Sequence, residues 1–92
     1  MTVRELLERQ AELEALLRNV GPVQFLRALR GAARGAQVRA HDSRQVPGGQ
    51  RATRFVFVDP SGVEAFVTVV SQLLAGGQPR YSLEVEARLG SA

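Results

Sequence analysis

The sequence contains no cysteine, no tryptophan and no lysine, and it has one histidine and one tyrosine. Without cysteine the chain can form neither a disulfide nor a thiolate metal site, which favours the reducing cytoplasm as its compartment. One histidine and scattered acidic residues do not supply the ligands of a zinc or calcium site. We therefore expect no metal and no other cofactor.

Long apolar runs and phosphate-binding motifs are also missing. No stretch approaches the ~18 apolar residues of a membrane span, and the charged N-terminal sequence MTVRELLERQ is unlike a signal peptide. Neither GxxxxGK[ST] nor GxGxxG occurs, so the glycine-rich phosphate loops are absent. These absences predict a soluble cytoplasmic protein with no membrane partner, and no small-molecule substrate is evident.

Residues that could carry catalysis have simpler explanations. His41-Asp42-Ser43 contains the residue types of a hydrolase triad, but consecutive residues of an extended chain point in alternating directions. Glu84 and Glu86 would share a strand face, yet paired-carboxylate chemistry needs a water-excluding cleft and substrate-binding aromatics. We interpret these residues as a surface histidine and solvated strand charges, and we expect no enzyme and no catalytic residue.

The length of 92 residues, 45% of them apolar, predicts a single domain over residues 1–92. A chain of this size buries only about 60–65% of the surface that its unfolded form exposes. The apolar residues therefore suffice for one core with little surplus, and self-association would add stability.

The stretch from residue 54 to 71, RFVFVDPSGVEAFVTVVS, predicts two strands joined by a turn at residues 59–62. Asp opens this turn, Pro sets φ at its second position, and Gly accepts a positive φ at its fourth. The predicted register pairs Thr53 with Val69, Phe55 with Val67, and Phe57 with Ala65.

Two helices are predicted before the strands, over residues 2–19 and 22–34. Thr2 and Glu5 form a capping box at the start of the first helix, and Gly21-Pro22 separates the two. The first helix carries apolar residues at helical spacing over less than three heptads. This pattern favours a helix packed on its own sheet over a dimerising coiled coil.

The predicted fold class is α+β: two N-terminal helices packed on one face of a three- to four-stranded antiparallel meander sheet. Residues 42–50 are predicted to be a mobile loop, because Pro-Gly-Gly cannot continue a strand. In the predicted register of the last two strands, Val85 faces Val69, and Arg54, Thr68 and Glu86 form a row on the outer face. The four predicted strands cover residues 36–41, 51–58, 63–74 and 80–89.

Alternation within these strands leaves apolar side chains on the sheet face that the helices do not cover. They are Val56, Val58, Phe66 and Val70. A contiguous exposed apolar patch marks a partner surface, unless the first strand or loop 42–50 covers it or the sheet tolerates β-branched residues there. We predict a non-enzymatic protein-interaction module, either a homo-oligomer (dimer) or one that binds an unidentified protein, through this face or the first helix.

The net charge of +3 is unevenly distributed, and all twelve basic residues are arginine. Residues 21–58 hold seven arginines and one aspartate, whereas both ends of the chain are net negative. This arginine-rich middle third supports an alternative function, nucleic-acid binding through the phosphate backbone, although we favour the interpretation that these are ordinary solvated surface arginines. The candidate residues are Arg27, Arg30, Arg34, Arg39, Arg44, Arg51 and Arg54.

Overall fold

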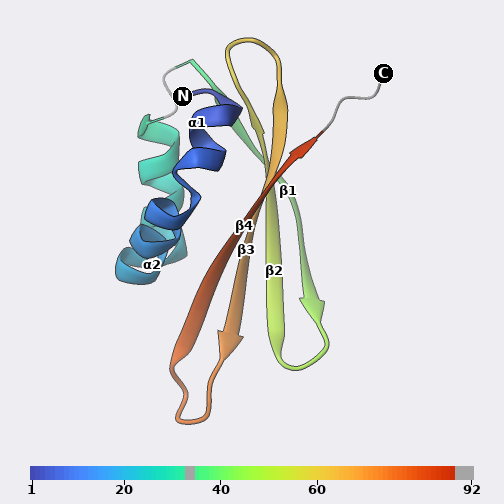
Figure 1. The fold of residues 1–92 in the computed structure, drawn as a ribbon. Helices are drawn as coiled ribbons and strands as arrows, with labels where there is room; N and C mark the ends of the chain where they lie inside the picture. The colour runs from blue at the N-terminus through green and yellow to red at the C-terminus, as the bar shows by residue number, and fades with distance from the viewer. Residues whose placement is uncertain (33–34, 89–92) are drawn as a thin grey trace.

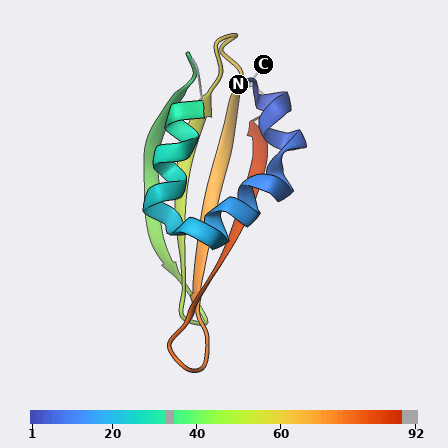
Figure 2. The same cartoon turned by 90° about the vertical axis from the view of Figure 1, so that its left-hand side faces the viewer.

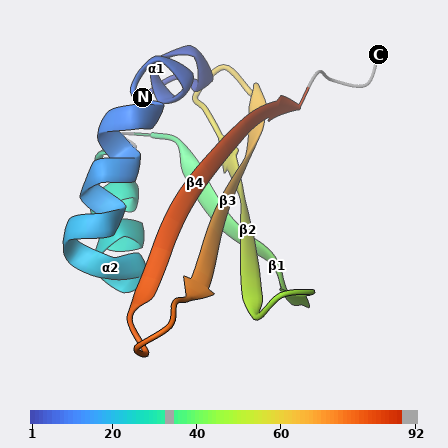
Figure 3. The same ribbon diagram turned by 60° about the horizontal axis from the view of Figure 1, so that its bottom comes forward.

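The computed structural model describes residues 1–32 and 35–88, which form a helical layer packed on an antiparallel sheet (Figure 1). This confirms the predicted α+β class with helices on one sheet face. Within the described residues the sheet order is β1-β2-β3-β4, and every neighbouring pair is antiparallel (Figure 3). The elements are α1 (Val3–Glu8), α2 (Gln10–Ala32), β1 (Gln37–Val46), β2 (Gln50–Val58), β3 (Glu64–Leu73) and β4 (Pro79–Arg88).

The helical layer is V-shaped because α2 is interrupted where the sequence predicts a break. Gly21 has a φ of 84° and a ψ of 168° inside α2, a backbone conformation that glycine adopts without steric cost. Figure 2 shows one arm, α1 with the first part of α2, beside β4, and the second arm over β1 and β2. The predicted first helix thus corresponds to α1 and the first arm of α2, and the capping box of Thr2 and Glu5 opens it.

The β2–β3 hairpin has the turn and the register that the sequence predicts. The Gly62 amide donates to the Asp59 carbonyl at 2.9 Å, and Gly62 has a φ of 90°. Phe57 pairs with Ala65 and Phe55 pairs with Val67. The turn residues therefore fix which side chains of both strands face the helices.

The predicted register of β3 and β4 was wrong by two residues. Val85 lies opposite Val67 instead of Val69, and Leu83 lies opposite Val69. The cause is the connecting loop, which is centred on Gly76, one residue earlier than the predicted pairing requires. Because side chains alternate with a period of two, a shift of two residues changes the neighbours across the strands but leaves every side chain on its predicted face.

The loop predicted at residues 42–50 was also wrong. β1 continues through Val46, and only Pro47-Gly48-Gly49 separates it from β2. A register shift between Ala40 and Asp42 marks a β-bulge, which interrupts the alternation by which a strand is recognised in a sequence. Both glycines of the turn have positive φ, so three residues reverse the chain. Residues 42–46 therefore lie within the sheet and do not cover its outer face.

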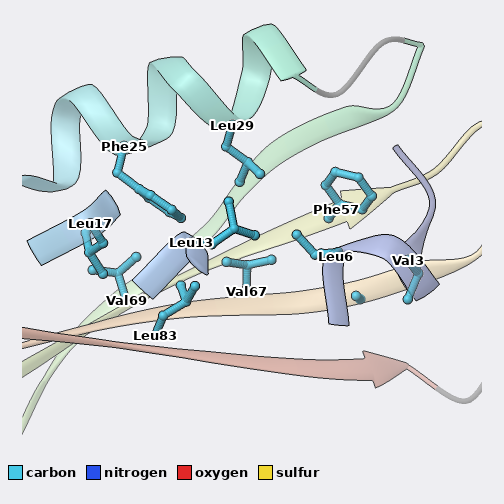
Figure 4. Close-up of a cluster of buried hydrophobic side chains, with 11 residues drawn as sticks. Val3, Leu6, Leu13, Leu17, Phe25, Leu29, Phe57, Val67, Val69 and Leu83 are labelled. Carbon is cyan, nitrogen blue, oxygen red and sulfur yellow. The ribbon is translucent and has the colours of Figure 1, made fainter. Parts of the chain in front are cut away.

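The core lies between the helices and the inner face of the sheet (Figure 4). Phe57, Leu6 and Leu17 are fully buried in it, and Phe25 and Leu29 come from the second arm of α2. Phe55 packs against the cluster while partly buried, and Leu89, the last residue of the predicted strand 80–89, lies outside the described residues. The complete set of buried apolar residues is Val3, Leu6, Leu13, Leu17, Phe25, Leu29, Phe57, Ala65, Val67, Val69 and Leu83.

Asp59 is a buried carboxylate that joins the helical layer to the β2–β3 turn. One carboxylate oxygen accepts from the Ser61 amide at 2.9 Å, the Ser61 hydroxyl at 2.6 Å and the Val63 amide at 3.0 Å. The other oxygen accepts from the Val3 amide, the first residue of α1, at 3.1 Å. These bonds, with that from the Ser61 hydroxyl as the largest contribution and that from Val3 second, lower the pKa of Asp59.

We expect Asp59→Asn to lower the melting temperature at neutral pH, because the new amide nitrogen cannot accept the hydrogen bonds of the oxygen that it replaces. The folded-state pKa of Asp59 lies below the unfolded value of about 3.9. Its contribution to stability is thus complete above that value and declines as pH falls through the folded-state pKa. The difference in melting temperature between wild type and variant should therefore become smaller in acid. Thermal circular dichroism from about pH 7 to about pH 2 measures it.

Glu12→Gln is the matched control for this titration. The pKa of Glu12 is also lowered, first by the side-chain hydrogen bond from Arg9. Both partners of that pair are exposed, however, and exposed pairs contribute little to stability. We expect its melting curve to stay close to wild type at every pH. A constant gap between wild type and Asp59→Asn down to acid pH would contradict the assigned role of the carboxylate.

Candidate interaction surface

The sheet face opposite the helices, called the outer face from here on, is built from rows of four side chains, one from each strand. The central row contains Arg39, Val56, Phe66 and Glu86. In Figures 1 and 3 no described element lies over this face. The flanking rows are Gln37, Val58, Glu64 and Arg88 on one side, and Asp42, Arg54, Thr68 and Glu84 on the other, followed by Arg44, Ala52, Val70 and Ser82.

Phe66 lies at the centre of the outer face between two guanidinium groups. The Arg54 Cζ is 5.0 Å from the centroid of the Phe66 ring, and the Arg88 Cζ is 5.5 Å from it. The two arginines come from the rows on either side of the ring, and Arg88 also pairs with Glu64 at 3.3 Å. Cation–π contacts of this kind fix the position of an exposed aromatic ring. Phe66 is thus a half-buried, positioned side chain.

The other three apolar residues of the predicted patch share the outer face with Phe66. Val56 lies directly opposite Phe66 on β2, Val58 is one row beyond it, and Val70 is two rows in the other direction. All three are half-buried by their neighbours in the sheet. Aromatic and arginine side chains around an apolar centre are the composition that is enriched in protein–protein interfaces.

The outer face is electrostatically asymmetric across the strands. Arg39, Arg44 and Arg54 lie on β1 and β2, whereas Glu84 and Glu86 lie on β4. Arg44 is partly neutralised by Asp42 at 3.1 Å. Neither of the two glutamates forms an ion pair with a residue that the structure describes. The β1 and β2 side of the face is therefore basic, whereas β4 carries both signs, because Arg80 and Arg88 lie on the same face as the two glutamates.

The predicted row of Arg54, Thr68 and Glu86 requires correction. Because β4 is shifted by two residues, Glu84 takes the place beside Thr68, and Glu86 lies beside Phe66. All of these residues remain on the outer face, as predicted. The corrected register brings an acidic residue into the central row with Arg39.

Three polar side chains of the first arm of α2 cover the free edge of β4. The Leu83 amide donates to Glu14 Oε2 at 2.9 Å, and the Leu83 carbonyl accepts from Gln10 Nε2 at 3.1 Å. The Arg18 Nε donates to the Tyr81 carbonyl at 2.9 Å. The three helix residues are four positions apart and so share one helix face. They replace the hydrogen bonds that a further strand would make, which closes this edge to strand addition.

The other edge of the sheet is protected in a different way. No described residue covers the backbone of β1 as α2 covers β4, but β1 carries Arg39 and Arg44 and has a β-bulge between Ala40 and Asp42. Charged side chains and bulges both discourage edge-to-edge pairing. With the inner face packed and both edges protected, the outer face is the part of the sheet that remains for a partner.

The basic residues of the alternative nucleic-acid site do not form one continuous stripe. Arg39, Arg44 and Arg54 gather on the outer face. Arg27 and Arg30 lie on α2, on the opposite side of the sheet. Arg51 is apart from both groups, since it shares the inner face with Ser43, to which its Nε donates at 3.0 Å. Arg34 lies outside the described residues.

One hollow of the described surface, of about 390 Å³, lies along the helices and includes Glu8 and Glu14 in its lining. Glu8 pairs with Arg4, and Glu14 pairs with Arg18 and holds the Leu83 amide. In residues 1–32 and 35–88 no group of acidic or histidine side chains is arranged to hold a metal ion.

Comparison with protein-family models, with curated proteins and with solved structures gives no significant match. Among the described helices none combines the length and the apolar character needed to cross a membrane. The functional interpretation therefore rests on the outer face and its surroundings.

The polar cover of β4 was not predicted from the sequence, although one signal was present. Gln10 interrupts the apolar positions of the first predicted helix at heptad spacing. A polar residue in such a stripe indicates a specific hydrogen bond where the helix meets its neighbour. Glu14 and Arg18 are four residues apart and pair on the helix surface, and their contacts with the strand depend on where α2 lies on the sheet.

We expect the double variant Glu14→Ala, Arg18→Ala to lose about 1–3 kcal/mol of unfolding free energy, because the Leu83 amide and the Tyr81 carbonyl lose their partners. It should also aggregate more readily, since the edge of β4 is uncovered. Urea unfolding and light scattering measure the two effects.

The control is Arg4→Ala, Glu8→Ala, which removes an ion pair of the same type from α1 without a strand contact. It should change the unfolding free energy by about 0.5 kcal/mol or less. Equal losses in the two double variants would show that the contacts with β4 are not stabilising.

Proposed function

We propose that this protein is a small non-enzymatic interaction module that forms a homodimer through its outer face. The observation that supports this best is the position of Val56, Val58, Phe66 and Val70 on one sheet face without a covering element among the described residues. Burial of these side chains against a second copy would add apolar contact that a single domain of this size lacks. The first helix is a weaker candidate interface, since its buried residues Val3 and Leu6 already belong to the core.

The size of the face predicts a weak dimer. Four strands about 4.8 Å apart, over about 20 Å of strand length, give roughly 400 Å² per copy. A standard interface buries about 800 Å² per partner. We therefore expect association in the micromolar range, with Phe66 as its central residue.

The surroundings of the acidic residues support the proposal that the protein is not an enzyme. Glu8 and Glu14, which line the hollow along the helices, are already engaged by Arg4 and Arg18. Asp59 has a lowered pKa and is occupied by four donors from the turn and α1. A general base near neutral pH requires a pKa close to 7. The pKa of Asp59 is instead lowered below the ordinary value of a carboxyl group.

We expect the wild-type chain to dimerise at concentrations up to about 200 µM, and Phe66→Glu to remain monomeric at the same concentrations. The variant should still fold, because the new carboxylate would lie between the guanidinium groups of Arg54 and Arg88. Sedimentation equilibrium measures the association, and circular dichroism verifies the fold.

Val23→Glu is the matched control, because Val23 is the most exposed large apolar residue of α2, with 68% of its surface accessible. It places the same charge on the helix side and should leave the dimer unchanged. A wild-type chain that stays monomeric throughout, or a folded Phe66→Glu that dimerises like wild type, would end the proposal.

Nucleic-acid binding is the second candidate, and the cluster of Arg39, Arg44 and Arg54 on one face supports it. Because Arg27, Arg30 and Arg51 lie on other surfaces, we expect no measurable binding to a mixed oligonucleotide by fluorescence anisotropy. If binding is found, it should weaken by about 0.9 log units per log unit of salt for each phosphate neutralised on a duplex. Retention of that binding after charge reversal of the three outer-face arginines would exclude this face as the site.

A further inference from the structure

One end of the molecule combines exposed apolar side chains with arginines. It consists of the bend of α2 at residues 18–24 and the two hairpin ends at residues 43–53 and 69–83, and it is called the distal end from here on. Figures 1 and 2 show the bend and both hairpin turns at the same end of the molecule, with the turns extending beyond the helices. We propose that the distal end binds the surface of an anionic lipid bilayer.

Exposed apolar residues concentrate at the distal end. Leu73 and Leu74 lead into the β3–β4 turn, with 67% and 40% of their surfaces accessible. Val20 and Val23 lie on either side of Gly21 at the bend, with 38% and 68% accessible. These are four of the six large apolar residues that are exposed in the described part of the chain. The distal end is therefore the most apolar part of the exposed surface.

The distal end is also positively charged. Its three segments contain four arginines and no aspartate or glutamate, whereas the rest of the chain has eight arginines and nine acidic residues. The net charge of +3 therefore divides into +4 on the distal end and −1 on the rest of the chain. The four arginines are Arg18, Arg44, Arg51 and Arg80.

Two of these arginines are available to an external anion. Arg18 and Arg44 each pair with an acidic residue that lies outside the distal end. Neither Arg51 nor Arg80 forms an ion pair with a residue that the structure describes. Arg51 lies on the inner side of the sheet and Arg80 on the outer side, so positive charge flanks the hairpin ends on both sides.

The order of these residues along the hairpin fits a lipid surface. Leu73 pairs with Pro79 next to the turn, Arg80 lies one row behind this pair, and Arg51 lies two rows behind it. Apolar side chains enter the boundary between headgroups and acyl chains, while arginines remain near the charged headgroups. A nucleic acid would engage the arginines but leave the leucines in water. The exposed leucines therefore favour a lipid surface.

This inference concerns contact with a membrane surface and not a membrane span. The expectation of no membrane partner came from the absence of a long apolar run and of a signal peptide, and a protein that binds the surface of a bilayer needs neither. The inference is also independent of the proposed dimer. Leu73 and Arg51 lie on the inner side of the sheet and not on the outer face.

The experiment is co-sedimentation of the full chain with vesicles of phosphatidylcholine, with and without phosphatidylglycerol. We expect binding to the anionic vesicles alone, and weaker binding as the salt concentration rises. The double variant Leu73→Ser, Leu74→Ser should bind about tenfold more weakly or less, because it loses apolar surface that enters the bilayer. Arg51→Glu, Arg80→Glu should lose about twentyfold or more, since each arginine near an anionic surface contributes about fivefold.

Each double variant has a matched control. Leu7→Ser, Val63→Ser also removes two exposed apolar side chains, but from α1 and the β2–β3 turn at the other end of the molecule. Arg27→Glu, Arg30→Glu makes the same change in net charge on the second arm of α2. We expect both controls to bind within about threefold of wild type at physiological salt, where exposed charges are screened beyond about 8 Å. Circular dichroism verifies the fold of every variant.

Several outcomes would overturn the inference. One is a wild-type chain that binds neither kind of vesicle, or binds both equally. Another is an equal loss in the two arginine variants, because net charge alone would then account for the binding. The third is a folded Leu73→Ser, Leu74→Ser variant that binds like wild type. If the wild-type chain also binds a mixed oligonucleotide through Arg51 and Arg80, this third result would identify a general polyanion site.

Discussion

The structure depends on the turn at residues 59–62, where one carboxylate fixes two relationships at once. Asp59 holds the amides of Ser61 and Val63, which sets the register of β2 and β3, and it holds the first amide of α1. Register decides which side chains of a strand face the core, and the bond to Val3 fixes where the helical layer begins above them. The division into an inner and an outer face follows from these bonds.

The parts of the fold that could be predicted are those that a short stretch of sequence determines. The β2–β3 register was predicted because Asp, Pro and Gly occupy defined positions in a short turn. The β3–β4 register was two residues off, since Gly76 and Gly77 in a five-residue connection allow several closures. The 42–50 segment was misjudged because the bulge after Ala40 hides the alternation of β1. In both wrong predictions the backbone adopts a conformation that the residue types allow, but other conformations would fit the same residues.

The sequence predicts which residues lie on the outer face, but it does not predict all of the contacts that they make there. Alternation alone assigns Val56, Val58, Phe66 and Val70 to one face, and an even register error leaves that assignment intact. The predicted register placed Arg88 directly opposite Phe66, whereas Glu86 is its neighbour on β4 and Arg88 reaches the ring from the next row. The cover of β4 depends on the position of α2, which no local pattern in the sequence specifies.

The protected edges of the sheet and the residues of the outer face act together in the proposed dimer. The side chains of α2 remove the backbone of β4 as a docking edge, and the bulge and arginines of β1 make the other edge unfavourable. The outer face is therefore the surface that the proposed homodimer would use, and its apolar centre would contribute most of the affinity. Exposed charges add little affinity, but opposing like charges carry a penalty, so they govern orientation. In the proposed dimer the apolar centre would therefore supply the attraction, and the surrounding charges would restrict how the two faces meet.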